Sequence, residues 1–219
     1  MGMQAIELPG ADLAFDPDWL PGDAATDLFT RLRHGIPWES HRIRVYGREF
    51  DPPRLSCWIG DPDARYRYSG RWFEPRPWMP DLAALRDRLA AELDVPFNSV
   101  LANLYRTGRD AMGFHRDSEP ELGDAPVIAS ISLGAERRFR LRPYAKHAVA
   151  GAHSLSIDLP HGSLLVMRGT TQRHYQHALP KTGRAVGERI NLTFRRIDHS
   201  SGNNSSAITN ASSRPSRAG

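Results

Sequence analysis

Short segments in which apolar residues recur at every second position fill the second half of this chain. Turn-forming residues separate them, with a glycine at Gly108, Gly123, Gly162 and Gly183. Such alternation predicts β-strands with one buried face, and many short strands divided by closely spaced turns favour a barrel or a jelly roll. The predicted strands cover residues 99–106, 127–133, 138–141, 153–159, 163–167 and 189–197.

Two helices are predicted before these strands begin. Asp23 is placed to cap the first, which runs through Leu28 and Leu32. The second follows Pro80 and Asp81, and it carries a stripe of leucines at Leu82, Leu85, Leu89 and Leu93. Both stripes have helical spacing and are expected to face the core. The predicted fold class is therefore α+β, mainly β, with N-terminal helices and a jelly-roll core.

Length and composition limit the classes to which the protein can belong. A chain of 219 residues is long enough for one domain with a sizeable core. No apolar run approaches the roughly 20 residues of a membrane span, and the first residues lack a secretory signal pattern. Cys57 is the only cysteine and lies in an apolar stretch, so we expect a small buried hydrophobe and not a reactive thiol. These features predict a cytoplasmic protein with no membrane partner.

Positive charge indicates a polyanionic partner without identifying one. The net charge is +4 and the sequence pI is about 9.6. Arg138, Arg140 and Arg142 would share one strand face, opposite Phe139 and Leu141. That row fits a track for phosphates, and it fits an ordinary solvated face equally well.

Two histidines and one aspartate have the composition of a metal site. His115 and Asp117 are two residues apart, so on a strand their side chains point to the same face, and His177 follows much later in the chain. Two histidines and one carboxylate are the ligands of the facial triad of non-haem Fe(II) oxygenases, which leaves open positions on the ion. The alternative is a surface salt bridge near a turn.

The last predicted strand carries charge on one face. Arg189 and Arg195 point the same way as Asn191, opposite an apolar face. Buried arginines need anions, and guanidinium groups bind carboxylates through two hydrogen bonds, so a short dicarboxylate such as 2-oxoglutarate fits between them. Asn103 and Tyr105 share a face of an earlier strand and are able to donate to the same ligand. A half-exposed charged strand and a core tyrosine are the alternatives.

Taken together, these segments resemble the AlkB family of Fe(II)/2-oxoglutarate dioxygenases, and most closely its duplex-DNA alkylation repair subgroup. The similarity covers roughly residues 38–198. It lies in residues 101–106, Gly113-Phe114-His115-Arg116-Asp117, residues 128–134, residues 161–167, His177-Ala178-Leu179-Pro180 and residues 189–195. The resemblance implies a double-stranded β-helix core (98–198) beneath a nucleotide-recognition lid (38–78), within one domain spanning 1–198. Residues 199–219 hold few large apolar side chains and are expected to be a disordered tail.

The resemblance also implies roles for individual residues. His115, Asp117 and His177 would bind Fe(II), and His177 is preferred to His174 because it precedes the small-Leu-Pro sequence of the family. The implied 2-oxoglutarate pocket consists of Asn103, Tyr105, Arg189, Asn191 and Arg195, with Arg195 beside Asp117.

Further positions would contact a base that has been flipped out of its stack. The resemblance places Tyr66, Tyr68 and Glu119 around that base; for Glu119, an exposed loop acid is the alternative. Tyr46 would form the tip of a hairpin that fills the gap in the duplex, which departs from the apolar tip of the duplex-specific members. Arg44 and Arg54 would contact the DNA nearby, as would Arg42 and Arg48.

The implied function is oxidative dealkylation of N-alkylated bases in DNA, of the 1-methyladenine and 3-methylcytosine type. Fe(II) would be the cofactor, with 2-oxoglutarate and O₂ as cosubstrates. We expect a monomer, associated with the nucleoid if the source is bacterial. The alternatives are an RNA or protein demethylase on the same scaffold and a metal-free jelly-roll binding module.

Overall fold

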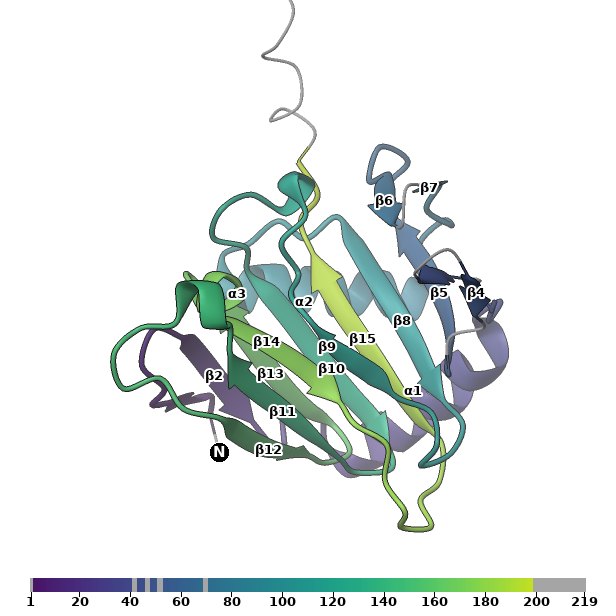
Figure 1. Cartoon of the computed structure of the whole chain (residues 1–219). Coiled ribbons are helices and arrows are strands. Elements are labelled where there is room, and N and C mark those ends of the chain that lie inside the picture. Colours follow the sequence, from purple (N-terminus) through teal and green to yellow (C-terminus); the bar gives the residue numbers. More distant parts are fainter. Residues whose placement is uncertain (1, 41–42, 46–47, 51–52, 69–70, 199–219) are drawn as a thin grey trace, which may run out of the picture.

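Two β-sheets face each other in the computed structural model, which describes residues 2–40, 43–45, 48–50, 53–68 and 71–198. Figure 1 shows the smaller sheet in front of the larger one, with α1 and α2 behind both. The predicted double-stranded β-helix fold is confirmed in this arrangement. The predicted tail and Tyr46 lie outside the described residues.

The larger sheet has seven strands in the order β1-β2-β13-β10-β15-β8-β5. Their bounds are β1 Gln4–Ile6, β2 Asp12–Asp16, β13 Ser163–Arg168, β10 Ile128–Gly134, β15 Arg189–Arg195, β8 Ser99–Tyr105 and β5 Leu55–Gly60. All pairings are antiparallel. Alternation predicted β8, β10, β13 and β15 to within two residues at each end, whereas it did not predict β1, β2 or β5.

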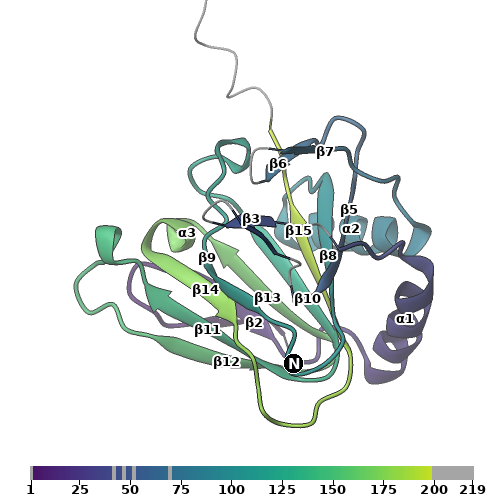
Figure 2. The same cartoon turned by 45° about the vertical axis from the view of Figure 1, so that its right-hand side comes forward.

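The smaller sheet has four antiparallel strands in the order β12-β11-β14-β9. They are β12 Leu155–Leu159, β11 Arg137–Pro143, β14 Tyr175–Leu179 and β9 Met112–His115. Two hairpins come before and after β5 in the range where the lid was predicted: β3 (Ile43–Val45) with β4 (Arg48–Phe50), and β6 (Tyr66–Tyr68) with β7 (Arg71–Phe73), which Figure 2 shows at the top of the molecule.

Helices α1 (Gly22–Gly35) and α2 (Pro80–Leu93) cover the outer face of the larger sheet. The prediction that Asp23 caps α1 is wrong. Pro21 is the N-cap, with φ −55° and ψ 142°, and no side chain caps the helix. The ring of Pro21 fixes the entry of the chain, and Asp23 lies in the first turn, where a negative charge favours the helix dipole. No helix in the described part of the chain is long and apolar enough to cross a membrane.

The two faces of β15 serve different environments. Ile190, Leu192 and Phe194 pack with residues of α1 and α2 in the main core. The opposite side chains point between the sheets. There, the space near β2, β11, β12 and β13 is filled by a second apolar cluster that includes Leu13, Leu141 and Leu159. The space near β8, β9, β14 and β15 is lined by polar side chains, so the fold places a polar cavity inside the sandwich.

Candidate functional site

Two histidines and one carboxylate meet between the sheets. His115 is the last residue of β9, and it pairs with His177 of β14 across the ladder. Ligand atoms of His115, Asp117 and His177 all lie within 4.8 Å of one another. The imidazole ring centroids are 4.2 Å apart. The structure therefore gathers the three residues that the sequence predicted as metal ligands.

Asp117 lies beyond the end of the strand, and not within the strand as the sequence had predicted. β9 ends at His115, so Asp117 does not use the alternation of a strand. Its position depends on long-range contacts: Arg195 donates from Nε and Nη2 to Asp117 Oδ2 over 3.1 and 2.7 Å. The backbone N–H of Asp117 donates to Oε1 of Gln172 over 3.1 Å. A buried carboxylate is stable only when it is paired in this way, and the contact with Arg195 is the one that the resemblance implied.

The protonation states in the site suit a divalent cation. His115 Nδ1 donates to the carbonyl of Gly113 over 2.9 Å, and Nε2 is the ring nitrogen that faces Asp117 Oδ1, 3.6 Å away. That separation is too long for a hydrogen bond, so a cation is able to bind both atoms. Burial lowers the pKa of His177 to about 3, so its imidazole is neutral near pH 7. Burial would raise the pKa of Asp117, but the neighbouring Arg195 and the histidines outweigh it and hold that pKa well below its ordinary value. Two imidazoles and one carboxylate match the donor set of a facial-triad iron site.

Arg189 is a buried cation with no carboxylate beside it among the described residues. It is 2% exposed, its Nη2 donates to Ser132 Oγ over 2.8 Å, and its Nε has no hydrogen-bond partner there. Burial lowers the pKa of the guanidinium to about 10, which still leaves it charged near pH 7. A buried, unpaired charge is costly, so this side chain fits an anionic ligand.

The other residues predicted to bind 2-oxoglutarate line the same cavity as the triad and Arg189. They are Asn103, Tyr105, Asn191 and Arg195. The guanidinium carbon of Arg189 lies 5.3 Å from the Tyr105 ring centroid. Asn191 donates from Nδ2 to Ser130 Oγ over 2.8 Å. The cavity therefore holds the iron set and the dicarboxylate set together, although the role of each residue stays a prediction.

Arg54, which was predicted to contact DNA, does not lie on the surface. It is buried, and its Nε donates to Asn103 Oδ1 over 2.8 Å, so it belongs to the surroundings of the cavity. The backbone of Tyr66 and Tyr68 forms β6 and that of Arg44 lies in β3, but their side chains lie outside what the structure describes. The predicted DNA and base contacts of these residues remain predictions.

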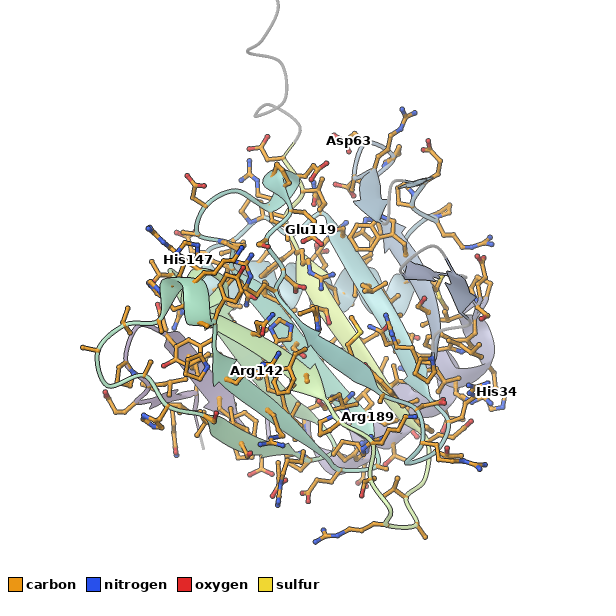
Figure 3. The ribbon with its side chains drawn as sticks, viewed as in Figure 1. His34, Asp63, Glu119, Arg142, His147 and Arg189 are labelled. Carbon is orange, nitrogen blue, oxygen red and sulfur yellow. The ribbon has the colours of Figure 1, made fainter. Side chains whose placement is uncertain are left out.

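Glu119 is half-buried and precedes the 3₁₀ turn η1 (Pro120–Leu122). It is not among the residues that line the cavity. In Figure 3, Glu119 and Arg189 lie toward opposite ends of the strands. Its predicted contact with a base stays a prediction.

His174, the rival third ligand, lies apart from the triad. It belongs to the short helix α3 (Thr171–His174), and its Nδ1 donates to the carbonyl of His147 over 2.6 Å. His177 is the histidine grouped with His115 and Asp117. The structure thus groups His177, and not His174, with the other two residues, while its role as a ligand stays a prediction.

The arginine row of β11 faces solvent. Arg138, Arg140 and Arg142 are exposed, while Phe139 and Leu141 are buried. Arg138 donates to both carboxylate oxygens of Asp158 over 2.8 and 2.9 Å. Figure 3 shows Arg142 over the near sheet. The alternation predicted for this strand is confirmed.

Sequence reasoning missed several polar residues of the site: Ser130, Ser132, Thr193, Gln172 and, as a cavity neighbour, Arg54. One signal was available for the serines, because they occupy alternate positions of an otherwise apolar strand and so share one face. Gln172 has no such signal, because its partner is 55 residues away.

Comparison with known proteins agrees with this geometry. The family model described as the 2OG-Fe(II) oxygenase superfamily matches residues 12–195. The chain is 37% identical over 186 residues to alpha-ketoglutarate-dependent dioxygenase alkB homolog 3 of Bos taurus, a match that covers 83% of this chain and 64% of that protein. It is 39% identical over 192 residues to DNA oxidative demethylase ALKBH2 of Mus musculus, covering 84% of this chain and 80% of that protein.

A solved structure shares the fold. The structure of OsALKBH1 superposes with a TM-score of 0.61 at 17% sequence identity, and the match covers 89% of this chain and 100% of that one. The chain spans less than two thirds of the length of the alkB homolog 3 relatives, 64% in Bos taurus and 59% in Rattus norvegicus.

Proposed function

This chain belongs to the AlkB branch of the 2OG-Fe(II) oxygenase superfamily, and from that premise we propose that it removes alkyl groups from nitrogen atoms of DNA bases by oxidation. The observation that carries the proposal is the cavity itself, which is lined by a two-histidine, one-carboxylate set and by Arg189, a buried arginine with no carboxylate beside it among the described residues. The names of the relatives supply the substrate class: ALKBH2 of Mus musculus is a DNA oxidative demethylase.

Each side chain of the cavity has a task in this proposal. His115, Asp117 and His177 would hold Fe(II), which together with 2-oxoglutarate and O₂ supplies the oxidising chemistry when bound. Arg189 would bind the far carboxylate of 2-oxoglutarate, where its charge has no partner among the described side chains. Arg195 keeps Asp117 ionised and fixed in place. The apolar wall that includes Phe139 and Met167 limits the access of water to the reacting centre.

Substrate turnover tests the proposal directly. The full chain would be incubated with Fe(II), 2-oxoglutarate and oligonucleotides that carry 1-methyladenine or 3-methylcytosine, as single-stranded DNA, duplex DNA and RNA. Mass spectrometry would follow the loss of the methyl group, and succinate would be quantified in parallel. We expect demethylation of DNA with an equal amount of succinate. Demethylation of RNA alone would reassign the substrate, and the absence of turnover on all three would overturn the proposal.

A pair of histidine variants ties any activity to the site. His177→Ala removes a member of the triad, so it should abolish turnover. His174→Ala removes a histidine that is three positions away and is hydrogen-bonded elsewhere, so it should leave most of the activity. Equal activity of the two variants would contradict the assignment of the metal site.

A further inference from the structure

Gln172 connects a short helix to the backbone of the carboxylate in the triad. Its side chain is buried, and its Oε1 accepts the N–H of Asp117 over 3.1 Å. On the other side of the amide, Nε2 lies 3.5 Å from the sulfur of Met167. A thioether is a weak acceptor, so the bond to Asp117 is the stronger polar contact of this amide.

The backbone of Asp117 needs such an acceptor. β9 ends two residues earlier, so the ladder between β9 and β14 does not extend to this N–H. Asp117 is 4% exposed. A buried N–H without an acceptor is costly, and the chain would move to avoid that cost. Gln172 therefore supplies the acceptor for this N–H beyond the end of the ladder.

The helix that carries Gln172 is itself fixed. Thr171 Oγ1 accepts the N–H of Asp12 over 2.9 Å and donates to the carbonyl of Arg168 over 2.6 Å. Arg116 donates from Nη1 to the carbonyl of Gln172 over 3.3 Å. α3 is thus attached to β2 at its first residue and to the chain beside Asp117, so the acceptor is presented from a defined position.

We propose that Gln172 is a positioning residue for the metal-binding carboxylate of Asp117. Two contacts position Asp117. Arg195 binds its Oδ2 and Gln172 accepts its backbone N–H, so that Oδ1 lies 3.6 Å from His115 Nε2. Groups that orient metal ligands in this way typically change metal affinity about 10–100-fold when they are removed. The inference rests on the proposed function, because it takes Asp117 to be a metal ligand.

Cobalt(II) binding by the full-length apoprotein tests the inference without turnover. Co(II) would be titrated while its visible absorption is recorded, for the wild type and for Gln172→Met, Gln172→Glu and Gln176→Leu. Met and Glu both abolish the amide contact with Met167, but Glu keeps an oxygen in place to accept the N–H. Gln176 is the matched control: it neighbours His177, yet its Oε1 accepts from Arg142 on the outer face of the small sheet.

We expect Gln172→Met to bind Co(II) about 10–100-fold more weakly, with a changed absorption spectrum. Gln172→Glu should keep the spectrum of the wild type, as should Gln176→Leu. Wild-type affinity and spectrum in Gln172→Met would overturn the inference, and so would the same spectral change in Gln172→Met and Gln172→Glu.

Amide exchange in the wild type gives a readout that does not depend on any variant folding. The N–H of Asp117 should exchange slowly even though it lies outside the ladder, and rapid exchange would overturn the inference. Failure of the wild type to bind Co(II) would instead overturn the proposed function. The two proposals can therefore fail separately.

Discussion

Arg195 and Asp117 form an ion pair of 2.7 Å in which both side chains are only 6% exposed. A second pair, between Arg138 and Asp158, has a similar separation of 2.8 Å, but its side chains are 57% and 46% exposed. In each pair the guanidinium donates two hydrogen bonds to the carboxylate group. Arg195 donates both bonds to Oδ2, whereas Arg138 donates one to each oxygen, and the larger difference between the pairs is their burial.

Removal of the arginine should have very different effects in these two pairs. Arg195→Met leaves a buried carboxylate without its cation and should lower the free energy of unfolding by about 3–5 kcal/mol. Arg138→Met removes a pair that solvent already screens and should cost at most about 1 kcal/mol. Urea denaturation of the metal-free protein at pH 7 measures both values. Similar losses in the two variants would show that burial does not govern the energy of the pair.

Arg189 should determine the response of the protein to 2-oxoglutarate. In the presence of Mn(II), a ligand at 100 times its Kd should stabilise the wild type by about 2.7 kcal/mol, a rise in Tm of roughly 5–10 °C. Arg189→Met should lose most of this rise, because the far carboxylate loses its cation. Arg140→Met, which changes an exposed arginine of β11 in the small sheet, should keep it. Thermal unfolding with and without the ligand measures the difference.

The same variant gives a second expected result. Without ligand, Arg189→Met should melt at a higher temperature than Arg195→Met. Arg189 has no carboxylate partner among the described residues, so its removal leaves no buried carboxylate without a cation. If 2-oxoglutarate stabilises Arg189→Met as much as the wild type, Arg189 does not bind its carboxylate.

Cys57 should be unreactive while the protein is folded. The residue is 1% exposed, and burial raises the pKa of its thiol to about 11. At pH 8 only about one thiol in a thousand would be ionised, and the thiolate is the reactive form. Iodoacetamide should therefore modify Cys57 of the folded protein far more slowly than it modifies glutathione. Once urea has unfolded the protein, the two rates should be similar. Modification of the native protein as fast as glutathione would contradict its burial.

Asp110 should make the stability of the loop after β8 depend on pH. Burial would raise the pKa of its carboxyl, but the side chain and backbone of Arg106 donate to it and lower that pKa below its ordinary value. The folded state then binds this proton less readily than the unfolded state. The resulting stability is present above about pH 4 and is lost as the pH falls through the folded pKa.

Asp110→Asn removes that contribution. It should cost about 1 kcal/mol at pH 7, a value reduced from that of a fully buried pair because the side chain of Arg106 is 47% exposed. The difference from the wild type should shrink at pH 3. Urea denaturation at the two pH values measures it, and a difference that is the same at both would contradict the assignment.

Alternation predicted the strands that have one polar and one apolar face, and it missed those that do not. Every residue of β5 after Leu55 is buried, so its apolar run carries no period of two. β9 has four residues, one of them Gly113, and β1 has three, so neither is long enough for a pattern to stand out. The helices were found from their leucine stripes, but the start of α1 was not, because Pro21 and not Asp23 fixes it.

The functional residues divide in the same way. The arginines of β15 were predicted from strand alternation, and His115 from its spacing to Asp117, because both are local properties. His177 was predicted from the family motif that follows it. Asp117 was predicted as a ligand and as a neighbour of Arg195, but its position beyond the end of β9 and its contact with Gln172, 55 residues away, were not predicted. Arg54 was expected at the DNA and is found against Asn103, because a contact across 49 residues leaves no trace in local sequence. Tertiary contacts, more than propensities, complete this site.

Because β15 has one apolar and one polar face, insertions and deletions within this strand should be excluded. A single inserted or deleted residue between positions 189 and 195 would exchange the two faces of the strand beyond that point. Apolar side chains would then point into the cavity, and arginine side chains would point into the core beside α1 and α2. The connection at 180–188 carries no such constraint on length from the sheets. Within that connection Pro180, Thr182 and Glu188 are held by hydrogen bonds to Arg137, Gly108 and Ala135. Descendants of this protein should therefore change in length at the exposed residues 183–185, while the seven residues of the strand can change only by substitution.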